Sequence, residues 1–218
     1  MLEDDNAYYV RVAERLRHKE RTVAIWDYER LILQHFPCIH KVKCINHATT
    51  KSFYSPGNFL IVVVPDLTNR NAVDPLQPKV DKNTLDEIAA FLTRHSSAWT
   101  EFQVINPLYE PVQTSIRLKL KRGFEFNYYE KVMDQKIREF LSPWISSGSR
   151  EIHFGGKVTK SMVIKFLEEL PFVDYLTAFS LFQYSSQKQA YGGDIEVAEA
   201  SNPASILVSA PYHEIINE

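Results

Sequence analysis

Four side chains of the kind that bind zinc fall within one short stretch of the sequence. They are Cys38, His40, Cys44 and His47. Structural zinc sites take closely spaced cysteines and histidines from two segments that wrap a tetrahedral ion. Here all four come from one expected strand, on which three share a face but are spread along it, whereas His47 faces the other way. A single extended strand cannot surround the ion, so we expect no metal site.

The two cysteines also do not suit a disulfide or a nucleophile. Six steps of about 3.3 Å along a strand separate Cys38 from Cys44 by about 20 Å, and a disulfide needs Cα atoms within about 7 Å. Reduced thiols of a cytoplasmic product are the simpler interpretation. A cysteine nucleophile would need a histidine base and an orienting group. The histidines are scattered along the chain and none has a recognised catalytic context.

Two pairs of acidic residues and one glycine-containing stretch invite a catalytic interpretation. Asp27 with Glu29, and Glu168 with Glu169, would suggest the carboxylates of a glycosidase. Neighbouring carboxylates on a helix point in different directions, so solvated helix faces are expected instead. The stretch 155–159, reading GGKVT, lacks the full GxxxxGK[ST] spacing of a phosphate loop and predicts a turn before a helix. We therefore predict no catalytic residue and no cofactor-binding residue.

Cations are concentrated near the N-terminus. Arg11, Arg15 and Arg17 lie on an expected helix, and His18, Lys19 and Arg21 follow, with acidic residues interrupting the run. An acidic partner, nucleic acid or plain solvent would each suit such a surface. The net charge of −2 and the pI near 6.4 argue against a general nucleic-acid binder. We expect a solvated or protein-facing surface, with these three arginines as assembly contacts.

The elements that position these residues can be predicted from hydrophobic periodicity. A first helix, capped by Asn6, should run to about His18, and a second should cover about Ile25 to Phe36. The second helix buries a stripe that contains Ile25, Tyr28, Leu31, Ile32 and Phe36. It stops at Pro37, because proline cannot continue a helix and restrains the residue before it. A strand over 38–46 follows, with Cys38, His40, Val42 and Cys44 on one face.

Later segments alternate between strands and helices. A capping box, with Thr84 as the N-cap and Glu87 three residues on, predicts one helix. Asn127 should cap another that ends near Leu141, and Ser161 should begin a third that stops at Leu170. Strands are predicted over 59–64, 102–107, 112–121, 175–184 and 204–212. The stretch 112–121 alternates cleanly, which is typical of a half-buried strand with a basic outer face.

The stretch from Ser185 to Pro203 is polar and contains no sustained apolar period. We expect it to be poor in regular structure, because it cannot bury enough surface to offset its ordering entropy. It is either an ordinary hairpin loop or a segment that becomes ordered against a neighbouring protein. In the second case Tyr191 and Ile195 are its apolar anchors.

Together these elements predict an α+β protein of two small units, with helices packed on mixed or antiparallel sheets. A helical arm spans 1–24, and the units span 25–108 and 109–218. Residues 33–39 and 167–173 echo one another, since in both a helix ends at a proline and a strand begins. This is either a structural repeat or two instances of a common corner. At 218 residues the chain can bury a real core.

Several short motifs resemble, in order, the C-terminal part of baseplate J-like proteins, over about residues 8 to 184. They are Asp27-Tyr28-Glu29, Phe36-Pro37 with the strand Val42-Lys43-Cys44, Asn106-Pro107-Leu108-Tyr109-Glu110, Phe140-Leu141-Ser142-Pro143-Trp144, Phe154-Gly155-Gly156-Lys157, and the run from Glu168 to Tyr175. Members of this family are wedge components of contractile phage tails and related injection systems. None of the motifs is a catalytic fingerprint.

This resemblance implies a non-enzymatic structural subunit without a cofactor. It would pair with copies of itself and with other baseplate proteins, namely wedge, hub and sheath-initiating subunits, and it would assemble in the cytoplasm into a phage-tail-like particle. No nucleic acid and no membrane insertion is implied, and the longest apolar run, 59–64, is too short to span a bilayer. No secretory signal is visible at the acidic N-terminus. A carbohydrate- or peptide-binding module and an enzyme with an unrecognised site are the alternatives.

Overall fold

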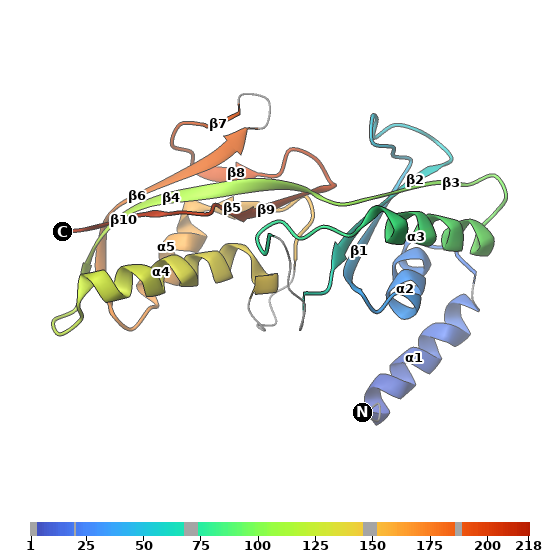
Figure 1. The fold of residues 1–218 in the computed structure, drawn as a ribbon, viewed down its shortest axis with the longest axis horizontal. Coiled ribbons are helices and arrows are strands. Elements are labelled where there is room, and N and C mark those ends of the chain that lie inside the picture. The colour runs from blue at the N-terminus through green and yellow to red at the C-terminus, as the bar shows by residue number, and fades with distance from the viewer. Residues whose placement is uncertain (1–3, 20, 68–73, 146–151, 186–188) are drawn as a thin grey trace. The chain divides into compact units, whose positions relative to one another are not determined.

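The computed structural model describes residues 4–19, 21–67, 74–145, 152–185 and 189–218. The chain divides into two compact units: residues 1–66 with 79–107, and residues 67–78 with 108–218. The segment Leu67–Pro78, which the sequence analysis assigned to the first unit, groups with the second. Both units combine helices with a mixed sheet, so the predicted α+β class is confirmed (Figure 1).

The first unit is a three-stranded sheet with helices on one face. Strand β2 is central, antiparallel to β1 and parallel to β3. The elements are α1 (Asp5–His18), α2 (Ile25–His35), β1 (Ile39–Asn46), β2 (Asn58–Pro65), α3 (Lys82–His95) and β3 (Glu101–Ile105). Helices α2 and α3 cover the sheet, as Figure 1 shows. The buried β-branched run of β2 was predicted correctly, and all residues from Leu60 to Val64 are buried.

The stripe predicted on α2 forms the core of this unit, with one exception. Tyr28, Leu31 and Ile32 are buried and pack with Val42, Ile61 and Val63 of the sheet. Ile25 was also predicted to be buried, but it lies in the first turn and is 41% exposed. The start of α2 is fixed by Asp27, whose carboxylate accepts hydrogen bonds from the amides of Val23 and Ala24.

Three predicted helix caps are wrong, although the helices themselves are present. Helix α1 begins at Asp5, before Asn6, and α4 begins at Phe126, before Asn127. Helix α3 begins at Lys82, and its N-cap is Asp81, whose carboxylate accepts from the amide and hydroxyl of Thr84. An aspartate and a threonine three apart can each serve as a cap, and the aspartate is the stronger acceptor here. The hydrogen bonds from Thr84 lower the pKa of Asp81.

Strand β1 differs from the prediction at His40. The pairing with β2 is irregular between Ile39 and Lys41, which is the signature of a bulge. The irregularity turns Ile39 inward and leaves His40 exposed, whereas Val42 and Cys44 stay buried. The expected single face of Cys38, His40, Val42 and Cys44 is therefore broken.

The second unit is built around one long strand, β4 (Leu108–Leu120), which is thirteen residues long. Strand β6 (Val173–Ser185) pairs with it antiparallel along one edge. On the other edge β9 (Ser205–Ser209) and β10 (Glu214–Asn217) pair with it in parallel, one after the other. The alternation predicted for β4 is confirmed, because Val112, Thr114, Ile116 and Leu118 are all fully buried.

Two helices cover this sheet on one face (Figure 1). They are α4 (Phe126–Leu141) and α5 (Lys160–Glu168), and a short 3₁₀ turn, Pro143–Ile145, follows α4. Met133 and Ile137 of α4 and Leu167 of α5 are fully buried in the core, beside residues of β4 and β6. Thr159 caps α5 by accepting from the amide of Met162.

The stretch 185–203 is mostly irregular where it is described, as predicted, but it contains two short strands that the sequence analysis missed. Strand β7 (Ala190–Tyr191) extends the sheet beyond β6, and β8 (Val197–Glu199) pairs with β5 (Lys157–Thr159). Ala198 is fully buried. The apolar residues of the stretch are few, but tertiary contacts with α5 and β6 supply the surface that its own sequence lacks. Residues 186–188 lie outside the described residues.

Candidate assembly surfaces

The predicted basic contacts lie on α1, a helix that touches the rest of its unit through few side chains. Arg17 stacks over the ring of Trp26 on α2 at 4.6 Å, and Glu14 lies 3.5 Å from Arg30. Arg15 and Arg17 are exposed, and Arg11 is partly buried. Tyr9, Val10 and Leu16 are also exposed, with 58 to 69% of each side chain accessible. Helix α1 therefore presents both cations and apolar side chains to solvent.

The two predicted apolar anchors of the loop are placed differently. Ile195 is half-buried against the core of its own unit, and its amide donates to the carbonyl of Leu181. Tyr191 remains 37% exposed, with its ring 5.4 Å from that of Tyr184. Of the two, Tyr191 is the residue whose side chain a neighbouring protein can still reach.

An ion-pair cluster fastens the same loop to α5. The ammonium of Lys160 lies 2.8 Å from the carboxylate of Asp194 and 2.9 Å from that of Glu196. Asp194 also accepts from the amide of Leu181 on β6. The hydrogen bonds from Lys160 and Leu181 lower the pKa of Asp194, and those to Asp194 and Glu196 raise that of Lys160. Three polar contacts, made by Asp194 and Glu196, thus hold the loop against α5 and β6.

The suspected metal ligands do not come together. Cys44 is buried, Cys38 is half-buried, and His40 and His47 are exposed. Within the described residues there is no group of three or more cysteine, histidine, aspartate or glutamate side chains arranged to hold an ion. Burial, reinforced by the nearby Glu29 carboxylate, raises the pKa of the Cys44 thiol to about 12. That thiol is therefore neutral and unsuited to nucleophilic attack.

A serine and a histidine that the sequence analysis did not single out form a close pair in the second unit. The hydroxyl of Ser209 lies 2.8 Å from Nε2 of His213, and both residues are about 1% exposed. Nδ1 accepts from the amide of Thr114 at 3.2 Å, so the ring proton resides on Nε2 and is donated to Ser209. The Ser209 hydroxyl donates in turn to the carbonyl of Ala210. The imidazole cannot act as a base toward this serine, and the pair is structural.

A buried carboxylate organises the start of β4. Glu110 is 4% exposed, and it accepts from the amide and hydroxyl of Ser201 and from the side-chain amide of Gln183. Gln183 also bonds both the amide and the carbonyl of Glu199. Each of the groups that contact the Glu110 carboxylate donates a hydrogen bond to it, as a buried carboxylate requires. Pattern analysis missed this network because its members lie far apart in the chain.

The other acidic pairs and the glycine stretch have structural roles. Asp27 caps α2, and Glu29 accepts from the amide of Cys44. Glu168 and Glu169 are exposed. Gly155 has a φ of +63°, and a Cβ there would lie 3.3 Å from Cα of Pro203, so this turn requires glycine. The expected turn before a helix is confirmed, with β5 lying between the turn and α5.

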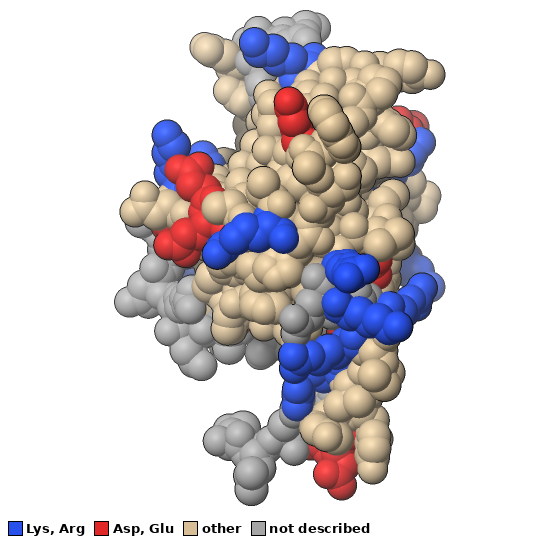
Figure 2. All heavy atoms as spheres, turned by 90° about the vertical axis from the view of Figure 1, so that its right-hand side faces the viewer, with Lys and Arg blue, Asp and Glu red and all other residues tan. Residues whose placement is uncertain are grey.

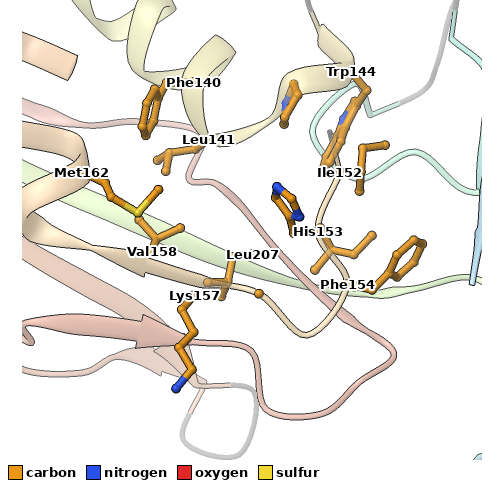
Figure 3. Close-up of a pocket in the computed structure, with 13 residues that line it drawn as sticks. Phe140, Leu141, Trp144, Ile152, His153, Phe154, Lys157, Val158, Met162 and Leu207 are labelled. Atoms are coloured by element: carbon orange, nitrogen blue, oxygen red, sulfur yellow. The ribbon is translucent and has the colours of Figure 1, made fainter. Parts of the chain in front are cut away.

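An apolar pocket of about 600 Å³ opens in the second unit. Figure 3 shows the imidazole of His153 among apolar side chains, with Lys157 directed away from them. The ammonium of Lys157 lies 2.7 Å from Glu199. The lining comprises Phe140, Leu141, Pro143, Trp144, Ile152, His153, Phe154, Gly156, Lys157, Val158, Met162, Ile206 and Leu207. None of these described lining residues is a carboxylate, so they do not supply the acid–base pair of a hydrolytic site.

Comparisons with known proteins identify the family. The family model described as "Baseplate protein PVC11-like" matches residues 2–209. No curated protein matches the chain. Among solved structures, a chain of the anti-feeding prophage (AFP) baseplate, determined by cryo-EM with six-fold symmetry, shares the fold, with a TM-score of 0.72 and 18% identity.

That alignment covers 97% of this chain and 42% of the AFP chain, so the present chain spans less than half of its structural relative. Of the described helices, none is both long and apolar enough to cross a membrane. The family model spans both units and nearly the whole sequence. The chain therefore belongs to the family of PVC11-like baseplate proteins, which are structural subunits of contractile, phage-tail-like injection systems.

Proposed function

We propose that the chain is part of a wedge subunit of the baseplate and that it is related to the C-terminal part of baseplate J-like proteins. It acts by binding copies of itself and neighbouring baseplate proteins, and it has no catalytic step. The observation that carries the proposal is the family match over residues 2–209. The AFP chain, which comes from an assembled baseplate, supports it through the shared fold.

The motifs that resemble the J-like family support a shared framework rather than a shared active site. Asn106 brackets Val80 by accepting from its amide and donating to its carbonyl. Tyr109 donates its hydroxyl proton to the carbonyl of Pro78, and Glu110 holds Ser201. Each contact fixes one segment of backbone within its own unit. Such contacts support packing and need no substrate.

The non-enzymatic role is supported by the polar groups of the described chain. In its buried serine–histidine pair, the His213 ring donates a proton to Ser209 and cannot accept one from it. Its buried Cys44 thiol is neutral, and the described lining of its apolar pocket has no carboxylate.

A carbohydrate-binding module would present stacked rings at its surface. The pairs Tyr8–Tyr9 and Tyr128–Tyr129 meet edge to face and do not form a flat stacking surface. Tyr54 and Trp99 are 93% and 92% exposed, and neither contacts another described ring. Single exposed rings of this kind suit protein interfaces.

Deletion and complementation of the gene in its own injection system test the proposal. Particles purified from cells that express the wild-type protein should contain it at a fixed ratio to the other baseplate proteins. Loss of the gene should abolish sheathed particles, and the wild-type gene should restore them. Intact, contractile particles without the protein would refute a wedge role, because a wedge subunit is required for the baseplate to close.

A further inference from the structure

A row of cations runs from α1 to the end of α3 in the first unit. Arg11, Arg15 and Lys19 are spaced four apart, so they lie in one line along the helix. Arg21 and Arg94 continue the line, because Lys19 borders two shallow grooves, one with Arg11 and Arg15 and the other with Arg21 and Arg94. We call these five residues the basic row. In Figure 2, Lys and Arg side chains gather on the face shown.

The internal contacts of the fold do not account for the whole row. Cations near a helix C-terminus complement its dipole, which explains Lys19 on α1 and Arg94 on α3. This effect is confined to the last turn of a helix, so it does not cover Arg21. Among the described residues, Lys19, Arg21 and Arg94 form no ion pair with a carboxylate. Five cations placed together repel one another, and a bound anion relieves that repulsion.

Apolar side chains stand between these cations. Leu16 is 68% exposed and Val23 is 84% exposed, and Tyr8 and Val23 each line one of the two grooves. The grooves have volumes of about 510 and 610 Å³, large enough to admit side chains of a peptide. A ligand for this surface must therefore be anionic and also carry apolar groups.

We propose that the basic row binds an acidic segment of a neighbouring baseplate protein, with carboxylates on the cations and apolar side chains against Leu16 and Val23. This inference rests on the proposed wedge function. A membrane surface and nucleic acid suit the geometry less well. A bilayer is a broad, flat surface, whereas these cations border two grooves whose volumes suit the side chains of a peptide. Nucleic-acid sites place several aromatic rings for base stacking, whereas each of these grooves is lined by one described ring, that of Tyr8 or that of His95, and His95 already packs on Phe91.

The backbone at Lys19 supplies a clean variant. Lys19 has a φ of +48°, a left-handed conformation in which asparagine and glycine are more stable than lysine. Lys19→Asn therefore removes one cation of the row while keeping or raising the stability of α1. Assembly should nevertheless weaken. A purely structural role for Lys19 would give the opposite pattern, with assembly unchanged or improved along with stability.

Two measurements on assembled baseplates test the proposal. Carbodiimide joins an amine to a carboxylate in direct contact, and mass spectrometry locates the joined peptides. Lys19 of the wild-type protein should be joined to an aspartate or glutamate of another baseplate protein. The second measurement uses Arg21→Glu with Arg94→Glu, which should lower incorporation into particles about tenfold at physiological salt. The matched control, Lys43→Glu with Lys51→Glu, makes the same charge change on exposed residues of the same unit and should incorporate normally.

The outcomes separate this proposal from the wedge function. If wild-type protein enters particles but Lys19 joins no carboxylate of another protein, or the Arg21→Glu, Arg94→Glu variant enters as well as the control, the acidic partner is refuted and the wedge function stands. If wild-type protein never enters particles, the wedge function itself fails. Retention of the purified full-length protein on vesicles with anionic lipid or on duplex DNA, lost in the double variant and stronger than binding to the baseplate, would also overturn the proposal.

Discussion

The two units hold their sheets together in different ways. In the first unit, most of these side-chain bonds reach backbone near in sequence: Asp27 bonds to residues three and four away, Glu29 to one fifteen away and Asn106 to one 26 away, and the bond from Thr22 to His95, 73 positions away, is an exception. In the second unit, Glu110 and Ser201 are 91 positions apart, and Thr114 and His213 are 99 apart. The first unit is specified mainly by apolar periodicity and local caps, whereas the second depends on buried polar pairs between distant strands.

The largest effect should come from the apolar core of the first unit. Leu31→Ala removes a fully buried side chain from the contact between α2 and the sheet and should lower the free energy of unfolding by about 2–5 kcal/mol. Denaturant unfolding of the purified protein measures this. Leu16→Ala, at a residue 68% exposed, is the control and should change stability by less than about 0.5 kcal/mol. Equal effects of the two changes would mean that the core is not where the structure places it.

His213 should make the second unit sensitive to mild acid. Burial, with a smaller contribution from the Arg138 charge, lowers the pKa of this histidine from 6.5 to about 4. Below about pH 6.5 the unfolded chain binds a proton that the folded chain does not, so the free energy of unfolding falls until about pH 4, by about 3 kcal/mol in all. Unfolding followed by tryptophan fluorescence at several pH values measures the slope. His213→Asn should lower stability but remove most of this slope, and an unchanged slope would assign it to other groups.

A substitution at Glu110 tests whether hydrogen bonds to a carboxylate, and not only the shape of the side chain, hold the start of β4. Glu110→Gln keeps the size but replaces a carboxylate oxygen with a donor that faces other donors, so it should cost about 1–3 kcal/mol. A double-mutant cycle with Ser201→Ala measures the coupling. The two changes should be strongly non-additive, whereas simple additivity would show that Glu110 and Ser201 act independently.

The fastening of the 189–199 loop should give a smaller and local effect. Lys160→Met removes the ammonium shared by Asp194 and Glu196, and the Ile195 amide should then exchange with solvent several-fold faster. The side chain of Lys160 is only 13% exposed, whereas Lys157, in its pair with Glu199, is 63% exposed. Lys157→Met is therefore the control and should leave exchange at Ile195 unchanged. Free exchange at Ile195 in the wild-type protein would contradict the described loop structure.

The smallest expected effect is that of metal removal on the first unit. Because His40 and His47 are exposed and separate from the buried Cys44, protein purified without chelator should contain well under one equivalent of zinc. Elemental analysis measures this directly, and a chelator should leave the melting temperature unchanged. One tightly held zinc per chain would require the strand β1 to be arranged differently.

Sequence patterns predicted most of the regular elements and the α2 stripe, because these depend on residues close in the chain. The period of Tyr28, Leu31 and Ile32, and the alternation along β4, each set burial directly. The prediction of a helix cap failed where two candidate residues compete within one turn, as Asp81 and Thr84 do. The predicted orientation of His40 was wrong because the bulge arises from pairing with β2, which the sequence of β1 alone does not encode.

The candidate surface was predicted only in part. A run of arginines on a helix is visible in the sequence, and so Arg11 and Arg15 were expected. Arg94 is far from these residues in sequence, and only the fold brings it near them. The amide and the hydroxyl of Thr22 both donate hydrogen bonds to the carbonyl of His95, which holds the two chain segments together. The strands of the 189–199 loop were missed for the same reason, since Lys160 and Asp194 are 34 positions apart.

The position of β4 has a mechanical consequence. The chain passes from the first unit into the second for the last time at Pro107, and the next residue, Leu108, is already the first of β4. A pull that arrives through Pro107 thus acts along a strand that is paired on both edges, with β6 on one side and β9 and β10 on the other. Its hydrogen bonds lie across the pull and must be sheared together rather than opened one at a time. Force therefore enters the second unit along a strand that is hydrogen-bonded on both edges, which suits a component of a contractile particle.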